Sequence, residues 1–342
     1  MFVFNAGIND LRSMQSIILL PVVFVLAHLA GDGLLHAQSF DLEQFDQLFR
    51  PRLRLDARWT PEVAFSDDPG TFEDRSVTAG FTVPVYKKWT AGLELNLTGD
   101  NLKEMLKNSI RVRATQVMVS ARYSGRDLRL SGDRHMLHSA SVGALGISLT
   151  KKYRVLFWSV NVNASEDETT IDRAVPRFNG VIGKLHIKGL RRQFFYGAAV
   201  SVSDGFNLPV PFVGGVEPIG DRWTFQYILP LQLAVGYKPG KRTRLLGGVV
   251  VDGFRSGFAF GDDRVNITYA ALRGFVGVRQ KLSNTIQLRA EVAGVPVHGI
   301  RLPRAGDELH QFPLDPGYSV MAGINIFFGQ STLERLVGEV LR

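Results

Sequence analysis

Large apolar residues alternate with smaller or more polar residues along the segment from Trp223 to Tyr237. The large residues are Trp223, Phe225, Tyr227, Leu229, Leu231, Leu233, Val235 and Tyr237. Successive side chains of a strand point to opposite faces, so the pattern predicts a single strand with one apolar face and aromatic residues at both ends. Its length exceeds the roughly 9–11 residues that a tilted strand needs to cross a bilayer. The segment therefore favours a membrane β-barrel.

The same alternation recurs along most of the chain. It is found at Arg52–Trp59, Val77–Val85, Trp89–Thr98, Leu156–Asn163, Val181–Lys188, Ile286–Val292 and Tyr318–Phe328. Strands that are polar on one face give a near-neutral mean hydropathy, and the mean hydropathy of this chain is +0.03. A soluble β protein of the periplasm has a similar composition and is an alternative at this point.

Short and long connections alternate between these segments. Short turns are predicted at Lys87–Lys88, Ser124–Arg126, Lys151–Lys152, Gly189–Arg192, Lys238–Arg242 and Leu282–Asn284. Longer links are predicted at Ser66–Arg75, Gly99–Ile110, Gly132–Ala140, Ser165–Arg173, Asp204–Asp221, Ser256–Asp263 and Gly299–Pro316. Six turns and seven links separate 14 strands, and an even number returns both ends of a barrel to one side of the membrane. The prediction is an all-β fold, a transmembrane antiparallel up-and-down β-barrel of about 14 strands, or 12 if the weakest strand, Asp127–Ser131, and a neighbour are lost.

Charge follows the division between short turns and longer links. The short turns are basic, whereas the longer links hold Asp67, Asp68, Glu73, Asp74, Glu166, Asp167, Glu168, Asp262, Asp263, Asp307 and Glu308. Outer-membrane barrels have short periplasmic turns and longer external loops. We therefore expect the acidic links to face outward and the basic turns to face the periplasm.

The first residues have the features of an export signal. Ile17–Ala27 is a short apolar run, Arg12 precedes it, and small or polar residues lead to Ala37. The pattern predicts a signal peptide over residues 1–37, with a membrane-anchor helix as the alternative. Residues 38–50 are expected to form a periplasmic segment or a plug, residues 51–329 the barrel, and residues 330–342 a periplasmic amphipathic helix. The expected location is the cell outer membrane, after export to the periplasm.

Composition narrows the function classes further. The chain has 342 residues and no Cys, which excludes a lipoprotein, a disulfide scaffold, a thiol enzyme and a Cys-ligated metal site. No run after residue 40 is long and apolar enough for a membrane helix. The net charge of +8 suits anionic lipid or anionic solutes. Basic residues are not interleaved with aromatic ones as in single-strand binders, so nucleic acid is not an expected partner.

Aromatic residues mark the ends of the apolar faces. All four Trp residues lie on such faces, near a strand end in three cases. Trp and Tyr gather at the two lipid–water interfaces of membrane proteins. The predicted aromatic girdle consists of Trp59, Trp89, Trp158, Trp223, Tyr237, Tyr318 and Phe328.

With its signal peptide, its strand rhythm and its closing strand Tyr318–Phe328, the chain resembles uncharacterised outer-membrane β-barrel families of Gram-negative bacteria. Such families carry domain-of-unknown-function labels, so no function transfers from them. The resemblance implies two partners, outer-membrane lipid and the barrel-assembly machinery, which reads a last strand that ends in an aromatic residue. Phe328 occupies that position, although this chain departs from the usual form because Gly329–Arg342 follow it.

The polar faces of the predicted strands supply the candidate lumen residues. They are Arg52, Arg54, Asp56, Arg58, Glu94, Asn96, Asn161, Lys184, His186, Lys188, Gln226, Gln232, Gln287, Arg289 and Glu291. Basic residues outnumber acidic ones in this set, and rings of Arg or Lys favour anions in a pore. The alternative is a packed network of opposed charges that closes the lumen.

Catalysis has little support in the sequence. The best cluster is Asp133–Ser139, which holds His135, His138 and Ser139 in a predicted loop. Adjacent residues of a strand point to opposite faces, and a loop fixes neither of them, so we interpret the cluster as a solvated loop. The sequence predicts no enzyme activity, no cofactor, and no catalytic or metal site.

Three functions follow from the predicted barrel. The leading prediction is a channel for passive transport of small solutes with a weak anion preference. The first alternative is a non-transporting barrel with a packed lumen that anchors or scaffolds envelope components. The second alternative is a transporter of hydrophobic solutes, which needs an apolar pocket inside the barrel.

Overall fold

The computed structural model describes residues 50–93, 110–150, 154–187, 192–202, 209–260, 263–303 and 309–329. The strands are β1 (Arg52–Ala64), β2 (Thr71–Leu93), β3 (Ile110–Leu130), β4 (Asp133–Thr150), β5 (Arg154–Asp167), β6 (Arg177–Ile187), β7 (Gln193–Val202), β8 (Val210–Pro218), β9 (Trp223–Leu229), β10 (Gln232–Tyr237), β11 (Thr243–Phe260), β12 (Asp263–Lys281), β13 (Ile286–Pro303), β14 (Leu309–Leu314) and β15 (Gly317–Phe327). A short 3-10 helix, η1 (Glu168–Arg173), follows β5. In this part of the chain, no helix has the length and apolar character needed to span a membrane.

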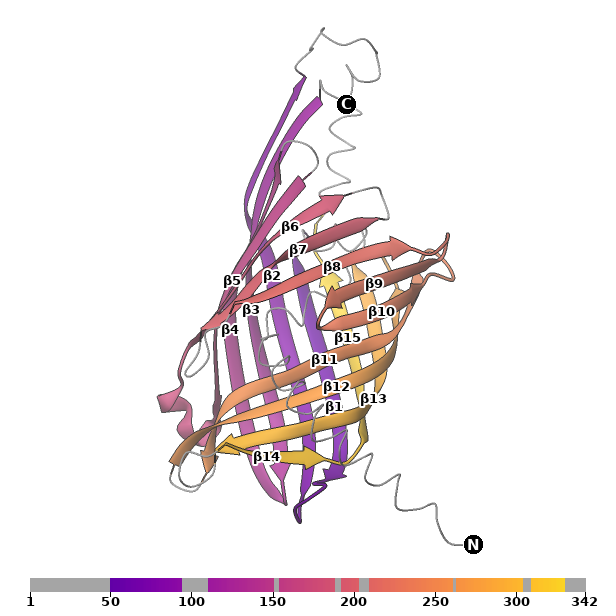
Figure 1. Ribbon diagram of the computed structural model, residues 1–342. Coiled ribbons are helices and arrows are strands. Elements are labelled where there is room, and N and C mark those ends of the chain that lie inside the picture. Colours follow the sequence, from indigo (N-terminus) through magenta and orange to yellow (C-terminus); the bar gives the residue numbers. More distant parts are fainter. Residues whose placement is uncertain are drawn as a thin grey trace, which may run out of the picture.

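Fourteen of these strands form a closed antiparallel ring (Figure 1). Each strand from β1 to β13 pairs with the next one along the chain, β13 also pairs with β15, and β15 closes the ring on β1. The short strand β14 pairs with the last residues of β13. The predicted all-β up-and-down barrel of 14 strands is therefore confirmed. The predicted signal peptide (1–37), residues 38–49 and the predicted C-terminal helix (330–342) lie outside the described residues.

The two ends of the barrel differ. Arg52, the first residue of β1, pairs with Phe327, the last residue of β15, and we call the end where they lie the terminal end. The opposite end, which we call the far end, holds the β1–β2 and β3–β4 connections, η1 and β14 (Figure 1). Four predicted short turns, from Lys151–Lys152 to Leu282–Asn284, follow strands that run toward the terminal end. β2 ends and β3 begins at the terminal end, whereas residues 99–109 of the link predicted at Gly99–Ile110 lie outside the described residues.

Trp223–Tyr237 is a hairpin and not the single strand that its alternation predicts. β9 and β10 pair with each other, and Trp223 lies opposite Tyr237 with the two ring centroids 4.5 Å apart. The chain reverses at Pro230, which follows a cis peptide bond. Directly opposed residues of an antiparallel pair point to the same face, so a pattern that is symmetric about Pro230 keeps the outer residues of both arms outside after the reversal. Leu231, in the turn, is buried instead. Periodicity alone therefore cannot distinguish the hairpin from a straight strand.

Two predicted turns lie inside continuous strands. Lys87–Lys88 is within β2 and Ser124–Arg126 is within β3, and these two strands pair from Phe72 opposite Leu130 to Leu93 opposite Ile110. The pairing register shifts between Pro84 and Tyr86, and this irregularity accounts for the break in alternation that precedes Lys87. The backbone ladder thus overrides a local signal that rests on charge and on one Gly.

Several predicted links prove to be strands. Residues 133–140 begin β4, because Ser131 and Gly132, both with positive φ, make a two-residue turn of the kind that favours hairpins. The link predicted at Asp204–Asp221 contains β8, and the link predicted at Gly299–Pro316 contains the end of β13 and β14. The number of strands in the ring is still the predicted 14. Merging within β2 and within β3 removes two predicted strands, and β8 and one arm of the β9–β10 hairpin add two.

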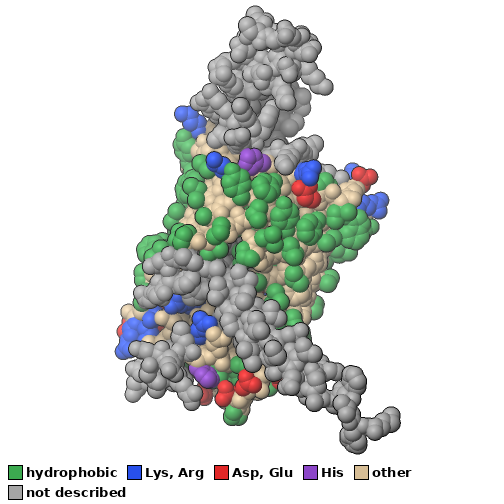
Figure 2. Space-filling view, viewed as in Figure 1, with side chains coloured by type: hydrophobic (Ala, Val, Ile, Leu, Met, Phe, Trp, Pro, Cys, Tyr) green, Lys and Arg blue, Asp and Glu red, His purple; other side chains and the backbone are tan. Residues whose placement is uncertain are grey.

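Alternation along each strand separates an outer face from an inner face. The outer face presents exposed apolar side chains, among them Leu55, Val77, Phe81, Val142, Ile182, Val249, Val276 and Val292. On the face seen in Figure 2, hydrophobic side chains cover the upper part of the barrel, with charged side chains near its upper and lower ends. A bilayer's hydrocarbon core requires such an outer surface.

Side chains close the barrel wall where the β9–β10 hairpin stops short of the far end. The last contact of the hairpin turn with β11 is the backbone bond from Val251 N–H to Leu231 O, 2.9 Å long. Farther along β11, the Ser165 hydroxyl of β5 donates to the Ser256 hydroxyl at 2.9 Å. Beside this bond, the Arg264 guanidinium donates to the buried Glu166 carboxylate at 2.7 and 3.0 Å. A side-chain seam thus joins β5 to β11 and β12.

Candidate functional site

A chamber of about 180 Å³ lies inside the barrel, enclosed by β1–β5, β9–β13 and β15. Its charged lining consists of eight arginines, Arg54, Arg58, Arg122, Arg126, Arg255, Arg273, Arg279 and Arg289, and three acids, Asp56, Asp252 and Glu291. Except for Arg255, these side chains point inward because each stands on the face opposite to exposed apolar residues of the same strand. Arg255 borders the chamber from the face of β11 that also carries the exposed Val249. The chamber is therefore a basic compartment inside an apolar shell.

Part of the lining is held by ion pairs between neighbouring strands. The Asp56 carboxylate of β1 accepts from Arg54 Nε at 2.5 Å and from Arg289 Nε of β13 at 2.7 Å. β15 lies between β1 and β13, and it has Gly323 opposite both Asp56 and Arg289. A Cβ on Gly323 would collide with these two side chains, so this position needs Gly to let the pair form.

A second set of ion pairs crosses the lumen. Arg58 Nη1 of β1 donates to Asp252 of β11 at 2.6 Å, although β12, β13 and β15 separate these two strands in the ring. Asp252 also accepts from Arg273 Nη1 at 2.7 Å, and Arg273 Nη2 donates to Glu291 at 2.7 Å. We call Arg58, Asp252, Arg273 and Glu291 the cross-lumen network. It limits the chamber on the side of the far end.

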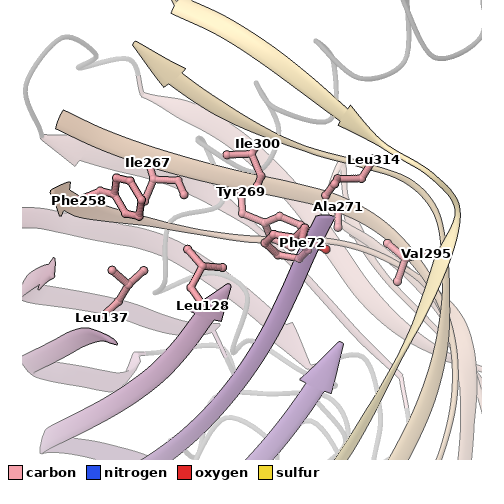
Figure 3. Packing of buried hydrophobic residues seen from close by; sticks show 10 residues of the cluster. All are labelled: Phe72, Leu128, Leu137, Phe258, Ile267, Tyr269, Ala271, Val295, Ile300 and Leu314. Carbon is pink, nitrogen blue, oxygen red and sulfur yellow. The ribbon is translucent and has the colours of Figure 1, made fainter. Parts of the chain in front are cut away.

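The far end beyond this network is packed. A pocket of about 20 Å³, bordered by Arg58, Asp74, Asp252 and Tyr269, has room for about one water molecule. After it comes the far-end cluster of Phe72, Leu128, Leu137, Phe258, Ile267, Tyr269, Ala271, Val295, Ile300 and Leu314. Figure 3 shows these side chains pointing toward one another from β2–β4 on one side and from β11–β14 on the other. Apolar side chains therefore fill the lumen at the far end.

Seven predicted lumen residues line the chamber, and three more face inward beyond it. Those in the chamber are Arg54, Asp56, Arg58, Gln226, Gln232, Arg289 and Glu291. Arg52, Asn161 and Gln287 are on the inner faces of β1, β5 and β13. Glu94, Asn96 and Lys188 lie outside the described residues.

Lys184 and His186 lie on the outer face, so their predicted place in the lumen is wrong. Lys184 pairs with Leu156 and shares its face with the exposed Ile182, whereas Leu185 is buried inside the barrel. His186 stacks on the exposed Tyr196 ring at 5.7 Å. Both residues follow the apolar part of β6 near the terminal end, where an outer side chain leaves the membrane core. Polar character therefore marks the membrane boundary here and not the inner face.

The predicted aromatic girdle is partly visible. Trp59, Trp223, Tyr318 and Phe328 are exposed on the outer face, and Tyr237 lies against Trp223. Trp158 is half-buried, with its indole over Gly146 of the neighbouring strand. Trp59 Nε1 donates to the Glu73 carboxylate at 3.1 Å, which satisfies the indole N–H at the edge of the apolar band. The side chain of Trp89 lies outside the described residues. Because β9 and β10 form a hairpin, Trp223 and Tyr237 mark the same interface, not opposite ones.

The histidines of Asp133–Ser139 do not form a site. The segment is the start of β4 and not the predicted loop. His135 contacts Asp167 at 3.1 Å and Phe258 on the inside, whereas His138 bonds the Tyr123 hydroxyl at 2.7 Å on the outside. Ser139 lines the chamber, on the face opposite to its neighbour His138. Among the described residues, no group of three or more His, Asp or Glu side chains is placed to hold a metal ion.

Sequence reasoning missed much of the basic lining. Arg122, Arg126, Asp252, Arg273 and Arg279 belong to the chamber. The first two stand beside the turn that was expected at Ser124–Arg126, so they were not assigned a face. Arg273 and Arg279 alternate on β12 with the inner Phe275 and Gly277, a mixed inner face that hides the period of two. Each of these two arginines is three residues from the outer Val276, and an odd spacing along a strand indicates the opposite, inner face.

A closed antiparallel ring with an apolar outer band and a charged interior defines the class, an outer-membrane β-barrel protein of the Gram-negative type. The chain is similar in structure to the COG4313 outer-membrane channel from Pseudomonas putida F1, with 9% identity, a TM-score of 0.41 and coverage of 82% of this chain and 96% of that chain. It is also similar to the Acinetobacter baumannii outer-membrane protein Omp33, with 10% identity, a TM-score of 0.32 and coverage of 82% and 98%. A third similar structure is the TodX monoaromatic hydrocarbon channel, as a deltaS2 mutant, with 8% identity, a TM-score of 0.34 and coverage of 82% and 90%.

No family model matches the chain, and no curated protein matches it. Membership of a particular family of unknown function therefore stays a prediction.

Proposed function

We propose that the protein is a channel for small anionic solutes whose far end is closed in the conformation described above. The observation that carries the proposal is the excess of guanidinium groups in the chamber, where seven inward-facing arginines stand against three carboxylates. A cavity with low-dielectric walls and charges of one sign concentrates solutes of the opposite sign. Guanidinium groups also bind oxyanions through paired N–H donors. A neutral apolar solute would have to desolvate these groups without replacing their hydrogen bonds, so the chamber disfavours the hydrophobic-solute alternative.

The second candidate function is a non-transporting barrel that anchors or scaffolds envelope components. The cross-lumen network and the far-end cluster favour it, because both fill the lumen with packed side chains. The two candidates differ in one property, which is whether the far end opens. A channel needs the side chains of the far-end cluster to separate at least transiently. A scaffold needs no opening, and the packed cluster stabilises it.

Ion selectivity in planar lipid bilayers tests the channel proposal. We expect rare openings of the wild-type barrel with a reversal potential that reports chloride preference across a KCl gradient. The double variant Arg122→Gln, Arg279→Gln removes two chamber charges and should move the reversal potential toward zero. Arg134→Gln is the matched control, because Arg134 is exposed at the far end and pairs with Asp127 outside the chamber. A cation-selective wild-type barrel would overturn the anion preference, and a barrel without openings would favour the scaffold.

We propose no catalytic activity, since His138 and Ser139 lie on opposite faces of β4. We also propose that the far end faces the outside of the cell and that the last strand is recognised by the assembly machinery. Exposed acidic residues of the β1–β2 connection, Asp67 and Asp68, support this orientation. Proteolysis of intact cells should cut at this connection, and cleavage at Lys238–Arg242 instead would reverse the orientation.

A further inference from the structure

The chamber has two unlike walls. Its polar wall comes from β2, β3 and β4, where Thr78, Ser124 and Ser139 stand in one row across the strands. The Thr78 and Ser124 hydroxyl groups are 2.9 Å apart. In the next row, Arg122 stands opposite Ser141. This wall offers hydroxyl groups and guanidinium donors side by side.

The other wall is apolar and comes from β10, β11 and β12. Leu246, Val250 and Phe275 line the chamber there, and they pack with Ala234 and Ala293 in one cluster. Phe275 pairs with Gly248, which lies between Leu246 and Val250 on β11, so no side chain stands between these apolar groups. A flat apolar surface of this kind binds an apolar ligand body by excluding water from it.

Arginines border the apolar wall along β12. Arg273 pairs with Val250 on one side of Phe275, and Arg279 is two residues beyond Gly277 on the other side. A ligand whose body covers Phe275 therefore lies between two arginines, of which Arg273 already donates to Asp252, Glu291 and Ser319. Chloride or phosphate would use the arginines but gain nothing from Leu246 and Val250.

We propose that the chamber binds small organic anions in which an oxyanion group is attached to a compact apolar body. This inference rests on the proposed anion channel and specifies its solute class. The size agrees, because an apolar protein cavity of about 150 Å³ accommodates benzene, and the chamber measures about 180 Å³. The apolar wall takes the body, and the arginines with the hydroxyl wall take the oxyanion.

Calorimetric titration of the purified, folded barrel in detergent tests the inference with three probes. Benzoate has both features, acetate has the oxyanion without the body, and benzyl alcohol has the body without the charge. We expect benzoate to bind roughly tenfold or more tightly than either of the other two, since each lacks a set of contacts. This ranking is measured on the wild-type protein and does not depend on any variant folding.

Two nearly isosteric substitutions then locate the apolar contact. Val250→Thr places a hydroxyl in the apolar wall and should weaken benzoate binding roughly threefold or more while leaving acetate binding unchanged. Val276→Thr is the matched control, because Val276 is exposed on the outer face of β12, next to Phe275, and should change neither.

The outcomes separate this inference from the channel proposal. Equal binding of benzoate and acetate, or a Val250→Thr variant that binds benzoate like the wild type, would overturn the inference but leave chloride preference in bilayers untouched. Tighter binding of benzyl alcohol than benzoate would overturn it in favour of neutral solutes. Failure of the channel proposal is read independently, from the reversal potential.

Discussion

Phe72 tests the closure of the far end more directly than any other residue. Its side chain is fully buried in the far-end cluster, and its ring stacks on Tyr269 with the centroids 5.1 Å apart. β2 and β12 carry these two rings from opposite sides of the lumen (Figure 3). Phe72→Ala removes the ring at the point where the two walls meet. We expect it to lower the free energy of unfolding and to raise the frequency of channel openings.

The magnitude follows from burial. Truncation of a fully buried Phe to Ala costs about 3–5 kcal/mol, which includes the void left behind. The stacking contact with Tyr269 supplies about 1 kcal/mol of that sum. The urea midpoint falls by the lost free energy of unfolding divided by the m-value. With an m-value of about 1–3 kcal/mol per M, we expect the midpoint to decrease by about 1 M or more.

The assay has two readouts on the same protein. Urea unfolding is followed by the gel shift between the folded and unfolded barrel, and openings are counted in planar bilayers. Val276→Ala is the control, because its exposed outer side chain should change neither readout appreciably. If Phe72→Ala left both the urea midpoint and the openings at wild-type values, the far-end cluster would not close the lumen. If the variant did not fold, Leu128→Ala in the same cluster would serve the same purpose.

Two further predictions concern the hairpin and the cross-lumen network. The double variant Trp223→Cys, Tyr237→Cys should form an intramolecular disulfide under mild oxidation, because paired strands place these Cα atoms within bridging distance. Recovery of two free thiols would contradict the hairpin and support a single straight strand. Asp252→Ala should cost about 3 kcal/mol, since the buried Arg273 and the partly exposed Arg58 guanidinium groups would face each other without their shared carboxylate. Urea unfolding checks this second prediction against Asp68→Ala, an exposed position that should cost less than about 0.5 kcal/mol, and an equal effect of the two variants would contradict it.

The sequence identified the faces of most strands because lipid imposes a strict requirement on one of them. Leu55 and Val292 are outside as their alternation predicts, Ile324 shares the face of Leu55, and Arg54 and Arg289 are inside. β6 is the exception, since its inner face holds the apolar Leu185 and its outer face ends in Lys184 and His186. When both faces are partly apolar, the period of two carries no information about which one faces lipid.

Strand ends were harder to predict than strand faces, for a physical reason. Backbone pairing with a neighbour decides where a strand stops, and that partner is not visible in a local pattern. β2 and β3 support each other across Lys87 and Gly125, where composition suggests turns, whereas Pro230 ends β9 inside an unbroken alternation. The ion pairs of the chamber could not be predicted for the same reason, because Arg58 and Asp252 meet only after the ring has closed.

The reversal potential of the Phe72→Ala barrel across a KCl gradient tests the central claim of an arginine-rich chamber behind a closed far end. Opening the far end should expose the inward-facing chamber arginines to permeating ions, so we predict frequent openings with clear chloride preference. Openings that prefer potassium would contradict the basic chamber. A folded Phe72→Ala barrel with no openings would contradict the channel and leave the packed scaffold as the function.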